Sequence, residues 1–457
     1  MRRLPLLLLC LSLLLSLAAA PPGQAAGGRP NFVIILADDL GYGDLSTYGG
    51  WIEVPHLDRL AAEGLRFTDF HSNGAVCSPT RAALLTGRYQ QRAGIPGVVF
   101  ADPRRPEHED GLQPVEITFA ELLSEHGYAT AIFGKWHLGY LPRYNPVRHG
   151  FQLFRGYVSG NVDYFSHVDQ AGAHDWWHDE KNVVEEGYST HLITRHALEF
   201  IERHAREPFC VYVAHEAPHY PYQTPGDDPR GFRRPGEPSV RQKLDEAEIR
   251  RRYRVMVEEM DAGTGRILAL LRRLGLERRT LVFFFSDNGA TPRGSNRPLR
   301  GRKGTVWEGG HRVPAIAWWP GKIRPGQVTS QLAAGFDLMP TMLELAGVPA
   351  PKERPLDGVS LVPVLLEGRK IDRSPLFWST GRALAMRDGP WKLVVGERAA
   401  KEPALFHLGE DLGETNNLAA RYPERLRRME KTARRWLQEV TASATPQPSQ
   451  AGRRAGR

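Results

Sequence analysis

The apolar residues of this chain form two kinds of segment. Continuous apolar runs occur at 32–37, 129–133, 209–214, 281–285 and 315–319. Such runs are typical of strands buried on both faces of a parallel sheet. Segments with apolar residues at helical intervals alternate with them, at 56–65, 117–126, 192–204, 253–274 and 332–346. This alternation predicts an α/β fold, a doubly wound sandwich with a large mixed, mainly parallel sheet.

The pattern changes beyond residue 365. Residues 382–395 resemble a hairpin around an Asp-Gly-Pro turn, and residues 422–440 have the pattern of a charged amphipathic helix. We therefore expect a main domain at 27–365 and a smaller C-terminal α+β subdomain with an antiparallel sheet at 366–442. Residues 443–457 end in several arginines, and we expect them to form a disordered basic tail.

The first 26 residues have the features of a signal peptide. Arg2 and Arg3 precede an apolar run that is too short to span a bilayer, and small residues follow it. Beyond this segment the chain has two cysteines, Cys77 and Cys210, and no Asn-x-Ser/Thr sequon. An exported chain without a disulfide framework is more typical of a bacterial periplasmic or secreted protein than of a lysosomal one. Cys210 lies inside an apolar run, and we expect it to be a buried small hydrophobe.

The chain is basic, with 60 Lys and Arg against 52 Asp and Glu, which gives a formal net charge of +8. This charge has two interpretations: a solvated, arginine-rich surface, or attraction of an anionic substrate. No nucleic-acid-binding motif accompanies it, and no later segment is apolar enough to span a membrane.

Oxygen donors follow two of the predicted strands. Asp38 and Asp39 come directly after the first strand, and Asp287 and Asn288 follow the fourth. Open α/β sheets bind ligands at the carboxyl ends of their strands. Hard oxygen ligands suit Ca²⁺ or Mg²⁺, and three converging carboxylates would repel one another without a cation. The alternative is that these are ordinary loop and cap residues.

Lysine and histidine follow the other two parallel strands. Lys135 and His137 flank a tryptophan after the second strand, and residues 215–219 spell His-Glu-x-x-His after the third. That zinc motif requires a helix, which Pro218 makes very unfavourable, so we do not expect a zinc protease.

The segment 140–188 lacks a regular pattern, and we expect it to shape the substrate pocket. Within it, His174 and His178 have helical spacing, but no third metal ligand is evident. We expect this stretch to be an exposed aromatic loop rather than a metal site.

Cys77 begins a motif with the features of a helix start. Ser78 is suited to cap a helix, Pro79 to its first position, and Gly87 to its end. Residue 77 would then lie at the positive end of the helix, near Arg81, where anions bind well. As a thiol, Cys77 could be an ordinary cysteine nucleophile, but hard metal ligands are a poor match for a thiolate.

A second anion contact is predicted at Lys303. It lies in the run Gly-Arg-Lys-Gly-Thr at 301–305, where glycines allow the backbone to approach a ligand closely.

These motifs together resemble one family, the formylglycine-dependent sulfatases of the alkaline-phosphatase-like superfamily. Residues 77–81 resemble its Cys-x-Pro-x-Arg maturation signal, and residues 134–139 resemble its second signature. Residues 286–289 and 303–310 resemble further family blocks, and the similarity runs from about residue 30 to about residue 420. The branch that contains arylsulfatase A and N-acetylgalactosamine-6-sulfatase is the most similar in appearance. The main domain would be the sulfatase catalytic domain.

The resemblance implies a metal and a modified nucleophile. Cys77 would be oxidised to formylglycine by a maturation enzyme, and one hydroxyl of the hydrated aldehyde would attack the sulfur of a sulfate ester. Ca²⁺ would be bound by residue 77 together with the four oxygen-donor residues Asp38, Asp39, Asp287 and Asn288.

The resemblance also implies roles for the remaining residues. Arg81 would steady the alkoxide, Lys135 and Lys303 would hold the sulfate oxygens, and His219 would protonate the leaving alcohol, with Lys303 as a further candidate. His137 would take a proton from the second hydroxyl and so expel sulfate. The roles of three residues stay open. His311 is either a substrate contact or a packing residue. Either Ser159 or Asn161 is expected to be a further sulfate contact.

The expected activity is that of an exported, Ca²⁺-dependent sulfatase acting on sulfated glycans, with aryl sulfates as surrogates. Two alternatives remain open: a phosphate or phosphonate monoester hydrolase on the same scaffold, and a catalytically silent glycan-binding relative. The expected partners are a sulfated substrate and the maturation enzyme, with no nucleic acid.

Overall fold

The computed structural model describes residues 28–237, 242–400 and 402–449. The predicted signal peptide and residues 450–457 of the predicted tail lie outside these ranges. Within them, no helix combines the length and the apolar character needed to cross a bilayer.

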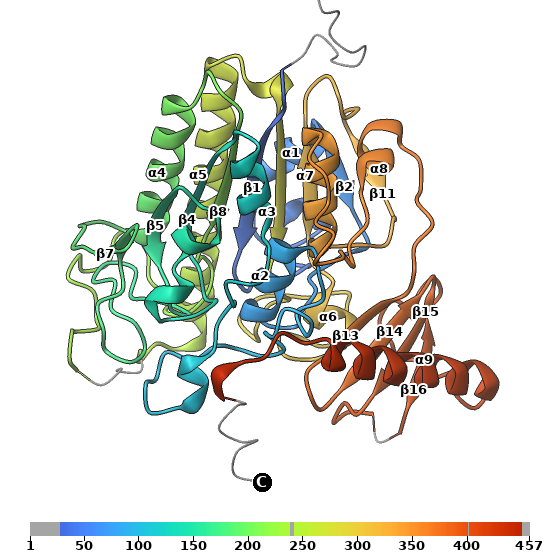
Figure 1. The fold of residues 1–457 in the computed structure, drawn as a ribbon. Coiled ribbons are helices and arrows are strands. Elements are labelled where there is room, and N and C mark those ends of the chain that lie inside the picture. The colour runs from blue at the N-terminus through green and yellow to red at the C-terminus, as the bar shows by residue number, and fades with distance from the viewer. Residues whose placement is uncertain (1–27, 238–241, 401, 450–457) are drawn as a thin grey trace, which may run out of the picture.

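A ten-stranded sheet forms the centre of the molecule (Figure 1), in the order β11-β2-β10-β9-β1-β8-β4-β5-β6-β7. The four strands at its centre are parallel: β9 (Thr280–Ser286), β1 (Asn31–Ala37), β8 (Phe209–Ala214) and β4 (Ala129–Lys135). The outer strands are β2 (Leu65–Phe67), β5 (Leu153–Tyr157), β6 (Trp177–His178), β7 (Lys181–Asn182), β10 (Ala315–Trp318) and β11 (Gln327–Thr329). All five predicted strands are present. The fifth, β10, runs antiparallel to β9, because the chain between them returns without a long crossover helix.

Helices cover both faces of the sheet, as a doubly wound fold requires. Alternate residues of β1 face opposite sides: Phe32, Ile34 and Leu36 belong to one core, and Val33 and Ile35 to the other. The helices on the first side are α2 (Cys77–Thr86), α3 (Phe119–Glu125), α7 (Leu338–Ala346) and α8 (Val362–Glu367); those on the second are α1 (Pro55–Ala62), α4 (Ser189–Arg203) and α5 (Glu246–Arg273).

The helix predicted at 56–65 ends at Ala62, and the one predicted at 192–204 starts at Ser189. Two other predicted helices also differ from the structure. The helix predicted at 253–274 starts earlier, at Glu246, because Asp245 caps it by accepting a hydrogen bond from the Glu248 amide at 2.8 Å. The segment predicted as one helix at 332–346 begins instead as the short strand β12 (Ala333–Ala334), which pairs with β3 (Phe70–His71). The Asp337 carboxylate accepts the Ala334 amide at 2.7 Å and so separates this strand from α7.

The C-terminal subdomain has the predicted antiparallel sheet, covered by one helix (Figure 1). Its elements are β13 (Leu376–Ser379), β14 (Leu384–Asp388), β15 (Trp391–Val395), β16 (Ala404–His407) and α9 (Pro423–Ala442). Trp307 and Phe336 of the main domain share a core with this sheet, and the short helix α6 (Glu308–His311) lies next to Trp307. The predicted boundary after residue 365 falls inside α8.

The first part of the predicted tail is ordered, which corrects that prediction. Thr445 donates its amide to the Arg92 carbonyl at 2.8 Å, and Ser449 donates its hydroxyl to Asp110 at 2.6 Å. Thr445 and Gln447 are buried, so residues 443–449 pack on the main domain instead of extending into solvent.

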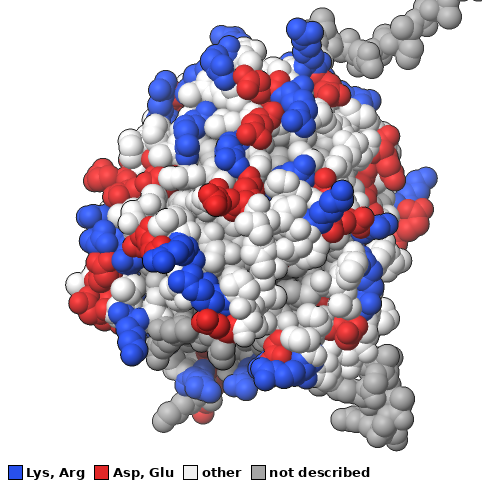
Figure 2. All heavy atoms as spheres, turned by 90° about the vertical axis from the view of Figure 1, so that its left-hand side faces the viewer, with Lys and Arg blue, Asp and Glu red and all other residues white. Residues whose placement is uncertain are grey.

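The Lys and Arg side chains do not form one patch on the face shown in Figure 2. Basic and acidic side chains are interspersed there. This face therefore fits the interpretation of a solvated, arginine-rich surface.

Candidate active site at the carboxyl ends of the central strands

The register of β1 and β9 brings the two acidic strand ends together. Ala37 pairs with Ser286, so the next residues of each strand lie side by side. The Asp39 amide donates to Asp287 Oδ1 at 3.2 Å, and Asn288 Nδ2 donates to Asp39 Oδ1 at 2.7 Å. Asp39 has a φ of 68°, a left-handed conformation that Asp tolerates better than most residues. The strand ends thus form one cluster, as their position in the sequence predicts.

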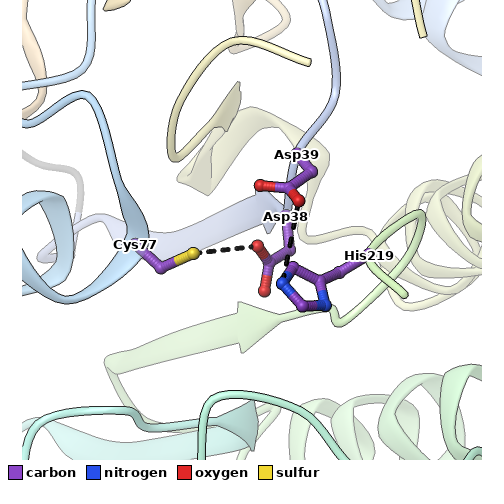
Figure 3. Close-up of side chains that lie close together, drawn as sticks. All are labelled: Asp38, Asp39, Cys77 and His219. Carbon is purple, nitrogen blue, oxygen red and sulfur yellow. Dashed lines mark hydrogen bonds and ion pairs between the residues drawn. The ribbon is translucent and has the colours of Figure 1, made fainter. Parts of the chain in front are cut away.

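Helix α2 presents Cys77 to this cluster. The helix starts at Cys77 itself, two residues earlier than a Ser78 cap would require, and Val76 is the extended residue before it. The Ser78 hydroxyl instead accepts the Val99 amide at 3.2 Å. Gly87, with a φ of 64°, ends the helix as predicted. Cys77 Sγ lies 3.3 Å from Asp38 Oδ1 (Figure 3).

Two lysines and an arginine surround the carboxylates. Arg81 Nη2 lies 3.0 Å from Asp287 Oδ2, and Lys135 forms an ion pair with Asp38. Lys303 Nζ lies 2.6 Å from Asp39 Oδ1.

Lys303 also lies 3.3 Å from Cys77 Sγ. Every predicted anion-binding cation is therefore within reach of the strand-end cluster and residue 77.

Burial and charge shift the acidities within the cluster. Burial opposes ionisation of Asp38, but Lys135 and the other nearby cations hold the pKa of this carboxyl well below its usual range. Burial and the neighbouring Asp38 raise the pKa of Asp287 to about 7. Burial, with the nearby carboxylates Asp287 and Asp38, also raises the pKa of the Cys77 thiol. A protonated thiol is a poor nucleophile, so these surroundings disfavour an ordinary cysteine mechanism.

The donor set fits a hard divalent cation. Asp38, Asp39, Cys77 and His219 offer ligand atoms that lie within 4.8 Å of one another. Asn288 Oδ1 is buried and has no hydrogen-bond partner within the described part of the chain, which is costly unless a ligand occupies it. A bound cation would also relieve the repulsion that raises the pKa of Asp287.

Two predicted histidines border the cluster. His137 has a φ of 57°, and its Nε2–H donates to the Val99 carbonyl at 3.1 Å. Its Nδ1 is buried and unpaired among the described residues. Burial and Lys135 hold the pKa of His137 well below its usual value, so Nδ1 is a free proton acceptor.

His219 lies in a loop, not in the helix that a zinc-protease motif needs. Its Nδ1–H donates to the Tyr220 carbonyl at 2.6 Å, and its Nε2 lies 3.7 Å from Asp39 Oδ2 (Figure 3). Burial lowers its pKa to about 4. The imidazole is therefore neutral in the free protein, with Nε2 facing the cluster.

A cavity of about 170 Å³ opens onto these groups. Its lining includes Cys77, His137, His219 and Lys303, and five further residues come from the segment predicted to shape the pocket: Tyr140, Ser159, Gly160, Asn161 and Gln170. The cavity adjoins a larger hollow of about 690 Å³, with which it shares Phe100, Ala101 and Gln170.

Hydrogen bonding distinguishes Ser159 from Asn161. The Ser159 hydroxyl donates to the Asn161 carbonyl at 3.1 Å. Asn161 Oδ1 accepts from Arg233 Nη2 at 2.9 Å, which leaves Asn161 Nδ2 buried without a partner among the described residues. The free donor in this wall of the cavity therefore belongs to Asn161.

His311 does not line the cavity, which corrects the substrate-contact alternative and leaves the packing one. It is fully buried, because α6 turns it toward the C-terminal sheet. Its ring stacks on Trp378 with centroids 3.9 Å apart, and its Nε2 lies 3.1 Å from Lys392 Nζ. Lys392 Nζ also lies 2.8 Å from Glu308 Oε1.

His311 thus belongs to a buried ion-pair network that joins the two sheets. The charged members are Asp69, Glu308, Arg312, Arg387, Lys392 and Glu414. Sequence reasoning missed this network, because its members are dispersed and follow no spacing rule.

Comparison with known proteins agrees with this geometry. The sulfatase family model matches residues 30–348, and a model described as N-sulphoglucosamine sulphohydrolase, C-terminal, matches residues 302–441. N-acetylgalactosamine-6-sulfatase of Mus musculus is 38% identical over 464 residues, which cover 89% of this chain and 84% of that protein. Arylsulfatase A of Homo sapiens is 35% identical over 501 residues, which cover 97% and 94%.

The fold is also similar to that of a solved structure. The crystal structure of Ps i-CgsB, also solved in complex with k-i-k-neocarrahexaose, matches with a TM-score of 0.78 and 28% identity over 89% of this chain and 92% of that one. The family match spans more than half of the chain, and both relatives match over more than four-fifths of their own length. The chain therefore belongs to the formylglycine-dependent sulfatase family and is a sulfuric ester hydrolase.

Proposed function

We propose that this protein hydrolyses sulfate monoesters of glycans, with residue 77 oxidised to formylglycine and with Ca²⁺ in the strand-end cluster. The observation that carries the proposal is the convergence of Cys77, the carboxylates and two lysines in one cluster, beside a cavity that Cys77 and Lys303 line. A phosphate or phosphonate ester hydrolase would use similar groups, so the closing experiment compares the two kinds of ester.

Asp38, Asp39, Asp287, Asn288 and residue 77 would hold the metal. Bound there, Ca²⁺ supplies Lewis-acid stabilisation of negative charge, and the hydrated aldehyde of residue 77 supplies an oxygen nucleophile where a thiol would be inert.

The cations orient the ester. Lys303 lies beside residue 77 and lines the cavity, so its ammonium group is placed to contact a sulfate there. Lys135 is buried and pairs with Asp38, and we assign it to the same sulfate from the strand side of the cluster. Fixed charges of this kind stabilise the charge that grows on the sulfate oxygens. Arg81, one turn further along the same helix, stabilises an oxyanion at residue 77. The unpaired Nδ2 of Asn161 is a further donor to the substrate.

The histidines move the protons. An anionic ester in the cavity raises the proton affinity of His219, whose Nε2 then donates to the leaving alcohol. His137 accepts a proton at Nδ1 from residue 77, because its Nε2–H is already committed to Val99. His219 thus acts as a proton donor and His137 as a proton acceptor, because a backbone carbonyl binds Nδ1–H of the first and Nε2–H of the second.

The shape of the entrance supports a carbohydrate substrate. The small cavity accommodates a sulfate group, and the adjoining hollow has room for sugar rings beyond it. A similar protein, Ps i-CgsB, has been crystallised with k-i-k-neocarrahexaose. We propose an exported protein that meets its maturation enzyme before Cys77 becomes buried.

Mass spectrometry of the tryptic peptide that contains residue 77, combined with paired kinetics, tests the proposal. We expect formylglycine at residue 77 in protein from a maturation-competent host. We also expect faster turnover of a sulfate ester than of the phosphate ester of the same alcohol, and no turnover by Cys77→Ala. An unmodified cysteine, or full activity of Cys77→Ala, would refute the mechanism; preference for the phosphate ester would refute the substrate class.

A further inference from the structure

A second group of metal-ligating side chains lies at the edge of the large sheet, away from the active site. His178 ends β6, Glu185 follows β7, and His196 lies on α4. His178 Nε2 is 3.2 Å from Glu185 Oε2, and His196 Nε2 is 3.0 Å from Glu185 Oε1. The three ligand atoms lie within 4.8 Å of one another. The fold therefore brings two ligands to His178 from separate segments, and His174, with which it has helical spacing in the sequence, is not part of the group.

Two neighbouring side chains, Trp176 and Glu199, contact Glu185 and His196 from outside the group. Trp176 Nε1 donates to Glu185 Oε2 at 2.6 Å. His196 Nδ1 lies 3.6 Å from Glu199 Oε2, one turn along α4. A carboxylate behind the far nitrogen is a common arrangement for a metal-binding histidine, because it sets the tautomer and the direction of the ring.

We propose that His178, Glu185 and His196 bind a divalent transition metal of the Zn²⁺ class. Two imidazoles and one carboxylate, completed by water, form a ligand set that suits Zn²⁺, whereas Ca²⁺ prefers oxygen ligands alone. Binding needs a lone pair on each Nε2, so the proton moves to Nδ1. The Nδ1–H of His196 then lies within ion-pair distance of the Glu199 carboxylate, at 3.6 Å, and that of His178, whose side chain is about one-third exposed, is open to water.

Arg195 is the competitor for this site. Its guanidinium forms an ion pair with Glu185, and its side chain is half exposed, so it can move into solvent when a cation binds. In a purely structural ion-pair cluster, Arg195 would only stabilise Glu185. In a metal site, Arg195 blocks one ligand and repels the cation, so its removal tightens metal binding.

The site would stiffen one wall of the catalytic cavity. The hairpin that carries His178 begins two residues after Asp175. Asp175 accepts the amides of Val158 at 3.1 Å and Ser159 at 2.8 Å. Ser159 lines the cavity. A metal that ties this hairpin to α4 therefore limits the motion of that wall without touching the reacting groups.

Titration of the full chain with Zn²⁺ tests the proposal, with Ca²⁺ in excess so that the strand-end cluster is filled. We expect one Zn²⁺ site, weakened at least roughly 10–100-fold in His178→Gln and in His196→Gln, and a higher melting temperature with Zn²⁺. Arg195→Gln should bind more tightly than the parent. His191→Gln is the matched control, because His191 also lies on α4 and pairs with a single carboxylate, Glu259, at 2.8 Å; it should bind as the parent does.

Co²⁺ serves as a spectroscopic probe of the same site. We expect weak d–d bands without a sulfur charge-transfer band, because the ligands are nitrogen and oxygen. Unchanged Zn²⁺ affinity in both histidine variants, or weaker binding by Arg195→Gln, would overturn the proposal. A sulfur charge-transfer band that disappears in Cys77→Ala would likewise overturn it, because the metal would then be at the active site.

Discussion

The raised pKa of Asp287 predicts that Ca²⁺ binding displaces a proton. Asp287 is fully buried between Asp38 and Arg81, and its pKa is raised to about 7 by burial and by Asp38. A metal binds the carboxylate and not the carboxylic acid, so metal binding must release the proton. The perturbation is the addition of Ca²⁺ to metal-free protein, in the Cys77→Ala variant so that the thiol contributes no proton.

The size of the effect follows from this pKa. At pH 6 the Asp287 carboxyl carries about 0.9 proton, and at pH 8 it carries about 0.1. His219, with its pKa lowered to about 4, is only about 1 % protonated at pH 6 and adds almost nothing. Ca²⁺ affinity should therefore rise close to tenfold per pH unit below pH 7 and level off above it.

Calorimetric titration in two buffers of different ionisation enthalpy measures the released protons directly. Asp287→Asn is the control: it should bind Ca²⁺ more weakly, and its binding should release almost no proton at pH 6. The reasoning is refuted if the parent releases less than about 0.3 proton at pH 6, or if Asp287→Asn releases as many protons as the parent.

Three further substitutions test other parts of the structure. In Gly160→Ala the new Cβ would lie 2.9 Å from the ring of His137, so kcat should fall roughly 100-fold with little change in KM; a loss under about twofold would contradict this role of His137. In His219→Gln, kcat for alkyl sulfates should fall by roughly 10²–10⁴ and kcat for nitrophenyl sulfate much less, because that leaving group needs little protonation; equal losses would contradict the assignment. Lys392→Met leaves Glu308 without one of its buried partners and should lower the free energy of unfolding in denaturant titrations by about 3–5 kcal/mol; a loss below about 1 kcal/mol would show that the network is not stabilising.

The sequence predicted the strands that carry the chemistry, because a strand buried on both faces leaves a continuous apolar run. It also predicted that Asp38 and Asp287 would meet, since the ends of parallel strands share one edge of the sheet. Strand β5 was missed, because Arg155 and Gly156 interrupt its apolar pattern.

Features that depend on tertiary packing could not be found in this way. His311 directly follows the block at 303–310 that resembles the sulfatase family, yet its ring contacts Trp378 and Lys392, which lie far along the chain. The partners of His178 come from a loop and a helix with no spacing signal. Ser78 satisfies every local rule for a cap, but tertiary contact with Val99 takes its hydroxyl.

The buried network between the two sheets has a consequence for engineering. Glu308 immediately follows the loop of Lys303 and meets Lys392 and Arg387 from the C-terminal sheet. A chimaera that takes this sheet from a relative would also need residues that pair with Glu308. Without them the Glu308 carboxylate would be buried and unpaired, which is strongly destabilising. We therefore expect the main domain and the C-terminal sheet to be exchangeable only together.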